Sequence, residues 1–161
     1  MNNYSGRRSF VLISAVHVAN NILKKGAEED ISITPLKLQK LVYFVFKDYL
    51  QRTGCELFSE QFETWTHGPV VPSIYTEFSS YGDNPIRSFA KDSRGKTYIV
   101  SETGDFKDSL DTAWGKYKRY TGSELSRFTH QENMAWTKAR DNRQRYLNIG
   151  DIMNEPEPQR S

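Results

Sequence analysis

The stretch that decides the fold is Ile33–Phe46, ITPLKLQKLVYFVF, and its apolar pattern continues to Leu50. It predicts a helix, because the Thr34 hydroxyl can accept a hydrogen bond in the first turn and Pro35 suits the first helical position. Apolar residues cover most of the circumference of this helix. Such a helix lies in the interior of a fold, so we expect the rest of the chain to wrap around it.

The polar residues of this helix share one narrow stripe. On a helical wheel the stripe holds Lys37, Lys40, Lys47, Asp48 and Gln51. Phe44 also falls in the stripe, where either another segment of the chain covers it or it contacts a partner, since aromatic anchors supply much of the energy at interfaces. Gln39 falls on the apolar side, and there we expect it to hydrogen-bond loop backbone in the core.

The composition is that of one globular domain. The 161 residues are enough to bury a core, and 13% of them are aromatic. Acidic and basic residues are interspersed with a formal net charge of +2, whereas a dedicated nucleic-acid binder shows a concentrated basic face, so we do not expect DNA binding. Cys55 is the single cysteine, which indicates a reducing, cytoplasmic location and no internal disulfide.

The beginning of the chain resembles a twin-arginine export signal, because Arg7 and Arg8 precede an apolar run. His17 and Ser14 interrupt that run, and the apolar residues around them recur at helical spacing. We therefore predict an amphipathic helix of a globular domain over about residues 8–24, ended by Gly26. No stretch approaches the apolar length that spans a bilayer, so we expect no membrane association.

The pattern along the chain predicts a mainly α (α+β) fold: a compact helical domain around a buried central helix, with a small antiparallel β element. Besides the central helix at about 35–53, helices are predicted at about 72–81, 106–120, 123–129 and 134–142. The best strand candidate is 96–102, and residues 57–66 are predicted to be extended, with a possible short strand at 62–66. We expect residues 1–150 to form the single domain. Residues 151–161, which contain Glu-Pro-Glu-Pro, are predicted to be a disordered tail.

The sequence contains no catalytic or metal-binding constellation that we can identify. No motif supplies Cys55 with an activating base, and the three histidines lack the spacing of metal ligands. His130-Gln131-Glu132 matches half of a zinc deaminase signature, but the paired cysteines of that signature are missing. A phosphate-cradling glycine loop is also missing. We therefore expect neither an enzyme nor a bound cofactor.

Two local clusters combine aromatic and turn residues. The first holds Trp65, His67, Gly68, Pro69 and Tyr75, and the second holds His130 and Trp136. Two interpretations stay open. Either the histidines tie backbone groups together within the fold, or both clusters meet the central helix and form a recognition surface.

Taken in order, these segments resemble the Panacea domain, an antitoxin family also described as SocA-like that includes phage-associated proteins. The similarity runs through 33–46, 62–72 (FETWTHGPVVP), 75–82, 120–130 and Trp136, and it covers most of residues 9–142. KLQKL followed by W-x-x-G-P-V at this separation is a specific combination. Two departures are Ala135, where the family usually has proline, and a shorter final segment after residue 148.

The resemblance implies a non-catalytic protein that binds and neutralises the toxin of a neighbouring gene, either by direct inhibition or as an adaptor that presents the toxin to a protease. We expect five residues at or near the toxin-facing surface: Lys37, Lys40, Phe44, His67 and Tyr75. The motif residues expected to be structural are Pro35, Gln39, Trp65, Gly68, Pro69, His130 and Trp136. Two alternatives are a phage or prophage protein that binds a host factor and a DNA-binding regulator of its own operon.

Overall fold

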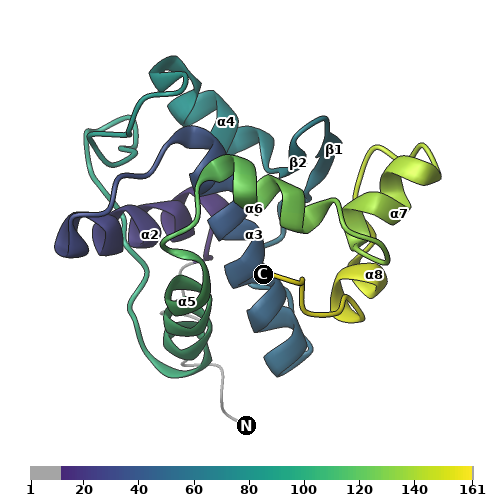
Figure 1. The fold of residues 1–161 in the computed structure, drawn as a ribbon. Coiled ribbons are helices and arrows are strands. Elements are labelled where there is room, and N and C mark those ends of the chain that lie inside the picture. The colour runs from purple at the N-terminus through teal and green to yellow at the C-terminus, as the bar shows by residue number, and fades with distance from the viewer. Residues whose placement is uncertain (1–11, 161) are drawn as a thin grey trace, which may run out of the picture.

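The computed structural model describes residues 12–160, and helix α3 (Pro35–Thr53) passes through the middle of the molecule (Figure 1). Five helices and one strand pack against it: α2 (Ala15–Glu29), α4 (Pro72–Phe78), α5 (Gly104–Tyr117), α6 (Gly122–Thr129), α8 (Ile149–Met153) and β2 (Gly68–Val70). The remaining elements are β1 (Glu63–Trp65), a 3₁₀ turn η1 (Ser79–Tyr81) and α7 (Ala135–Asp141). The predicted mainly α fold with a small antiparallel sheet is confirmed.

The ends of α3 follow from its own residues. The Thr34 side chain accepts a hydrogen bond from the Lys37 N–H at 3.3 Å, and Pro35 occupies the first turn. At the other end Gly54 adopts a left-handed conformation with φ of 79°, which suits a glycine. Local chemistry therefore fixes both ends before any tertiary contact is considered.

The two strands form a hairpin that the C-terminal part of the chain extends. β1 and β2 are antiparallel, with Trp65 opposite Gly68. On the other edge of β1, the Thr64 N–H donates to the Arg145 carbonyl at 2.8 Å, and the Leu147 N–H donates to the Phe62 carbonyl at 3.0 Å. Residues 145–147 thus cover the outer edge of β1, although they lie about eighty residues further along the chain.

Helix α2 begins and ends later than predicted. Its first turn is capped by Ser14, whose hydroxyl accepts from the His17 N–H at 3.2 Å, and the predicted start near residue 8 lies outside the described residues, as do Arg7 and Arg8. The predicted end at Gly26 is wrong. A Cβ at Gly26 would lie 2.7 Å from Cδ1 of Ile33, so this glycine permits close packing against the following turn while the helix continues to Glu29.

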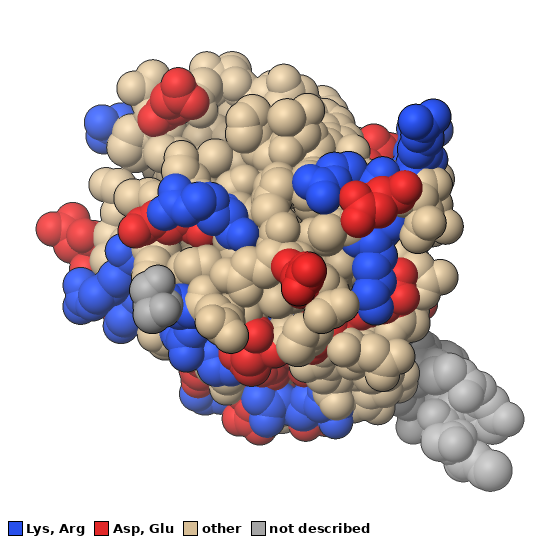
Figure 2. Space-filling model, turned by 45° about the vertical axis from the view of Figure 1, so that its right-hand side comes forward, with Lys and Arg blue, Asp and Glu red and all other residues tan. Residues whose placement is uncertain are grey.

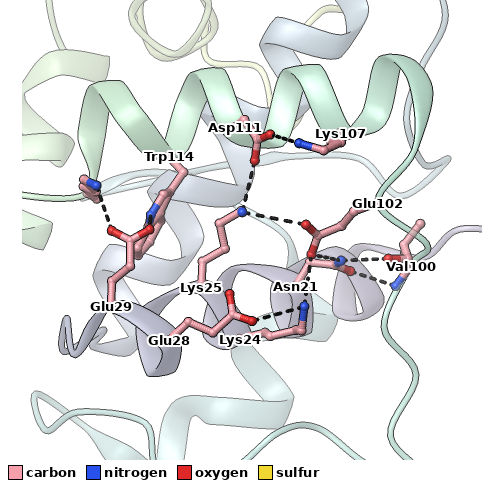
Figure 3. A network of polar contacts seen from close by, with 11 residues as sticks. Asn21, Lys24, Lys25, Glu28, Glu29, Val100, Glu102, Lys107, Asp111 and Trp114 are labelled. Atoms are coloured by element: carbon pink, nitrogen blue, oxygen red, sulfur yellow. Dashed lines mark hydrogen bonds and ion pairs between the residues drawn. The ribbon is translucent and has the colours of Figure 1, made fainter.

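The strand predicted at 96–102 does not form. Side chains of α2 take the place of a strand partner: the Asn21 amide both donates to the Val100 carbonyl and accepts from the Val100 N–H, each at 2.8 Å (Figure 3). Asn20 donates to the Tyr98 carbonyl at 3.1 Å. The backbone of this segment is therefore paired by asparagine side chains rather than by a neighbouring strand.

Ion pairs join α2 to α5 beside this segment. Lys25 Nζ lies 3.0 Å from Asp111 and 3.7 Å from Glu102, and the Trp114 indole N–H donates to Glu29 at 2.9 Å (Figure 3). A capping box formed by Thr121 and Glu124 opens α6. Within residues 12–160, no helix combines the length and the apolar character that crossing a membrane requires.

The predicted disordered tail at 151–161 is wrong for the residues that the structure describes. Helix α8 occupies the first of them, and Glu155 beyond it is only 6% exposed. Its carboxylate accepts hydrogen bonds from the Tyr43 hydroxyl and the Ala135 N–H, both at 2.8 Å, and lies 2.9 Å from Lys47 Nζ. Burial, together with the charge of Glu155, raises the pKa of Tyr43. A buried ion pair with α3 thus holds a segment whose composition suggested disorder.

We predict that Glu155→Ala lowers the free energy of unfolding by about 3 kcal/mol, because it leaves Lys47 buried without its carboxylate. The matched control is Glu157→Ala, which removes a solvent-exposed pair with Lys116 and should change stability by less than about 1 kcal/mol. Urea denaturation of both variants measures the difference. Equal losses would show that the buried pair does not hold the C-terminal segment.

Candidate functional site

The carbonyl groups of the hairpin are held by side chains from three helices. From α3, Lys40 Nζ donates to the Pro69 carbonyl at 2.8 Å, and the Gln39 amide donates to the Val71 carbonyl at 3.1 Å. The Val71 N–H donates in return to Gln39 Oε1 at 3.0 Å. Gln39 therefore binds loop backbone in the core, as the sequence predicts, and α3 supplies the hydrogen bonds that a third strand would give to β2.

Lys40 makes its contact from a fully buried position. Its side chain is 0% exposed, and burial lowers its pKa to about 7. No carboxylate within residues 12–160 offsets this burial. Gly68 makes room for the lysine: with φ of 118°, it takes a conformation that favours glycine, and a Cβ there would lie 2.8 Å from both Lys40 Cε and Thr129 Oγ1.

Side chains from α6 and α7 hold the turn of the hairpin. The Trp136 indole N–H donates to the Trp65 carbonyl at 2.8 Å, and the Ser126 hydroxyl donates to the His67 carbonyl at 2.5 Å. His130 lies between them, with its ring 3.7 Å from that of Trp136. Its Nε2 is 3.1 Å from the Thr66 carbonyl oxygen and its Nδ1 is 2.5 Å from that of Ser126. A neutral imidazole can donate to one of these oxygens and an imidazolium to both.

The hairpin held in this way forms one wall of a groove of about 670 Å³, which we call the hairpin groove. Its other walls are the first turn of α3 and the segment from α4 to the loop after η1. The lining residues are Pro35, Leu36, Gln39, Thr64, Trp65, Thr66, His67, Val70, Ile74, Tyr75, Phe78, Ser79, Gly82 and Asp83.

Aromatic side chains dominate the open side of the hairpin groove. Tyr75 is 50% exposed and meets Trp65 edge to face, with ring centroids 4.9 Å apart, and His67 is exposed beside them. The Thr64 hydroxyl oxygen is buried, and no group in the described part of the chain hydrogen-bonds to it. The groove thus offers a surface that is mainly aromatic and apolar.

Charge is sparse around this site. Among the lining residues, the only Asp, Glu, Lys or Arg is Asp83. In Figure 2 the upper part of the molecule, where α4 lies in Figure 1, carries few charged side chains, whereas lysines, arginines and carboxylates alternate lower on the same face. A partner surface for the hairpin groove would therefore be largely uncharged.

Two of the five predicted partner-binding residues, His67 and Tyr75, meet in the hairpin groove. The prediction that Lys40 and Phe44 lie at the surface is wrong. Phe44 is 3% exposed because Tyr117 of α5 stacks on its ring at 4.1 Å. Lys37 is also buried, and its Nζ donates to the Lys118 carbonyl at 2.5 Å. The three lysines of the stripe are buried because they find carbonyl and carboxylate partners after α5, in the hairpin and in the C-terminal segment, whereas Gln51 at the end of the stripe is exposed.

The structural motif residues divide between the groove and its support. Pro35, Gln39 and Trp65 line the groove, while His130 and Trp136 hold the hairpin from behind. Sequence reasoning missed several lining residues, among them Leu36, Thr64, Ile74 and Phe78. The spacing of Ile74 and Phe78 places them on one face of α4, which was a usable indication of a buried or groove-facing side. Nothing in the sequence distinguishes Thr64.

No group of three or more potential metal-ligating side chains occurs within residues 12–160. Cys55 is exposed at the end of α3, away from the residues that line the hairpin groove. The arrangement of the site is suited to binding, since its polar groups are occupied in holding backbone and its free surface is aromatic.

The pKa of Lys40 gives a pH-dependent prediction. In the unfolded chain a lysine keeps its ordinary pKa of 10.5, whereas burial lowers the folded value to about 7. Between these values the unfolded chain binds more protons, so stability rises with pH by about 2 kcal/mol from pH 7 to pH 9. We predict that Lys40→Met removes this rise in urea denaturation at both pH values, while the control Lys96→Met, at an exposed lysine, retains it. An unchanged rise in Lys40→Met would contradict the assignment.

Comparison with known proteins agrees with these features. The family model described as "Antitoxin SocA-like, Panacea domain" matches residues 38–137, which include Gln39, Lys40, the hairpin and Trp136. Antitoxin SocA of Caulobacter vibrioides (strain NA1000 / CB15N) is 33% identical over 129 residues, which cover 77% of this chain and 69% of that relative. No solved structure gives a significant match. The chain belongs to the family of SocA-like antitoxins with a Panacea domain.

Proposed function

We propose that this protein is an antitoxin that neutralises the protein toxin of a neighbouring gene by binding it directly, and that the hairpin groove is the contact surface. The family supports the antitoxin role. The single observation that carries the choice of surface is the aromatic groove itself, with Tyr75 half exposed beside Trp65 and His67.

The groove suits a protein partner for three physical reasons. Its volume of about 670 Å³ is within the range of natural ligand sites, so it can receive apolar side chains of a partner. Tyrosine and tryptophan are the side chains that most often dominate interface energies. The hairpin wall is already fixed by side chains of α3, α6 and α7, which reduces the entropy lost when a partner binds.

We predict that Tyr75→Ala abolishes neutralisation. The open reading frame next to the gene is expressed in a host with and without this protein, and surviving colonies are counted. Removal of a central aromatic side chain at an interface costs about 2 kcal/mol or more, which weakens binding about thirtyfold. The matched control is Tyr98→Ala, since Tyr98 is 47% exposed but lies outside the groove.

Each contrary result leads to a different reading. If Tyr75→Ala rescues as well as the unmodified protein while binding is intact, the hairpin groove is not the contact surface. If the neighbouring product is harmless, the protein acts on a host factor. Rescue that disappears in a host lacking a protease indicates an adaptor mechanism, and a salt-dependent gel shift with upstream DNA indicates an autoregulator.

A further inference from the structure

The connection from Gly82 to Thr103 runs between η1 and α5 without a helix or strand. Connections of this length inside a domain are uncommon and are usually functional. This one is fixed in place by α2. The Ala90 N–H donates to Asn20 Oδ1 at 2.9 Å, Asn20 donates back to the Ala90 carbonyl at 3.1 Å, and Asn21 pairs with Val100 (Figure 3). The connection therefore presents a defined surface.

A second groove, of about 490 Å³, lies between this connection and the turn that joins α2 to α3; we call it the loop groove. Its apolar lining includes Leu23, Ile31, Ile86 and Phe89, of which the last three are partly exposed. The Ile86 N–H donates to the Ile33 carbonyl at 2.9 Å, so one edge of the groove is joined to the α2–α3 turn by backbone. The loop groove is separate from the hairpin groove and shares no lining residue with it.

Basic side chains gather along the loop groove. Arg87 and Lys91 are exposed and line it, and Arg94 and Lys96 follow in the next turn. None of the ion pairs within residues 12–160 includes any of these four, although such pairs hold many lysines elsewhere in the molecule.

Two acidic residues belong to the same surface and offset part of the charge of the four basic residues. Asp30 lines the loop groove at the end of α2. Asp92 directs one carboxylate oxygen to the N–H groups of Arg94 and Lys96, at 2.9 and 2.8 Å, and so shapes the turn. The surface keeps an excess of positive charge beside an apolar floor.

We propose that the loop groove binds an acidic segment of a protein partner, which places apolar side chains on the floor and carboxylates against Arg87 and Lys91. Charge complementarity selects such a segment and raises its rate of association. The apolar floor favours a polypeptide over a nucleic acid, since phosphate groups would meet the basic side chains and leave Phe89 and Ile86 uncovered. This inference does not depend on which toxin, if any, occupies the hairpin groove.

A synthetic peptide tests the proposal. The probe is a fluorescein-labelled peptide of about twelve residues in which glutamate and leucine alternate, and fluorescence anisotropy measures its binding to the full-length protein. Two control peptides replace leucine by serine or glutamate by lysine. We expect the glutamate–leucine peptide to bind at least about tenfold more tightly than either control, and its affinity to fall as salt rises from about 0.05 to 0.3 M.

Variants assign the binding to the groove. We expect the double variant Arg87→Ser with Lys91→Ser to bind the glutamate–leucine peptide about tenfold more weakly and with a smaller salt dependence. We expect Phe89→Ser to weaken binding of this peptide without changing the salt dependence. The matched control is Arg119→Ser with Arg127→Ser, which removes two exposed cations outside the groove. Equal binding of all three peptides, an equal loss in the control variant, or competition by a short DNA duplex that binds more tightly would overturn the proposal.

Discussion

The structure depends on how the backbone of one short hairpin is hydrogen-bonded where it enters the core. Buried carbonyl groups must be paired, and β2 has no strand on its inner side within the described chain. Gln39 and Lys40 of the central helix provide the donors on that side, and Ser126, His130 and Trp136 provide them at the turn. Segments far apart in the sequence therefore meet on one hairpin. These hydrogen bonds fix where α3, α6 and α7 lie around the hairpin, and the same bonds hold the hairpin in place.

Lys40 donates to the Pro69 carbonyl of the hairpin, and this choice of donor explains the glycine at position 68 and the shape of the hairpin wall. A buried ammonium group without a carboxylate is unfavourable, and the lowered pKa of Lys40 expresses that cost. The contact requires Gly68, because a side chain there would occupy the space of the lysine. What results is a rigid wall with Trp65 and His67 on its outer side. Residues that make no contact with the solvent thus determine the shape of the surface available to a partner.

The predictions from the sequence were right where neighbouring residues determine the structure, and wrong where the structure depends on contacts between residues far apart in the chain. Thr34, Pro35 and Gly54 fixed the ends of the central helix because capping depends only on neighbouring residues. The grouping of His67 with Tyr75 followed from their proximity in the chain. Two features could not be foreseen: the burial of the α3 lysines and the order of the C-terminal segment. The first depends on contacts such as that of Lys40 with the Pro69 carbonyl, and the second on Glu155, which pairs with Tyr43 and Lys47 more than a hundred residues away. Such contacts leave no periodic pattern in the sequence. The strand predicted at 96–102 does not form, because asparagine side chains of α2, which the prediction did not include, hydrogen-bond its backbone.

The most direct test is hydrogen–deuterium exchange of the protein, measured alone and mixed with the purified product of the neighbouring gene. In the free protein the amides of Thr64 and Val71 should exchange slowly, because they donate to the Arg145 carbonyl and to the buried Gln39 side chain. On binding, we expect additional protection concentrated in residues 63–82, which contain the hairpin, α4 and η1. Protection confined to α7 and α8, with residues 63–82 unchanged, would contradict the central claim that the hairpin groove is the surface this fold presents to its partner.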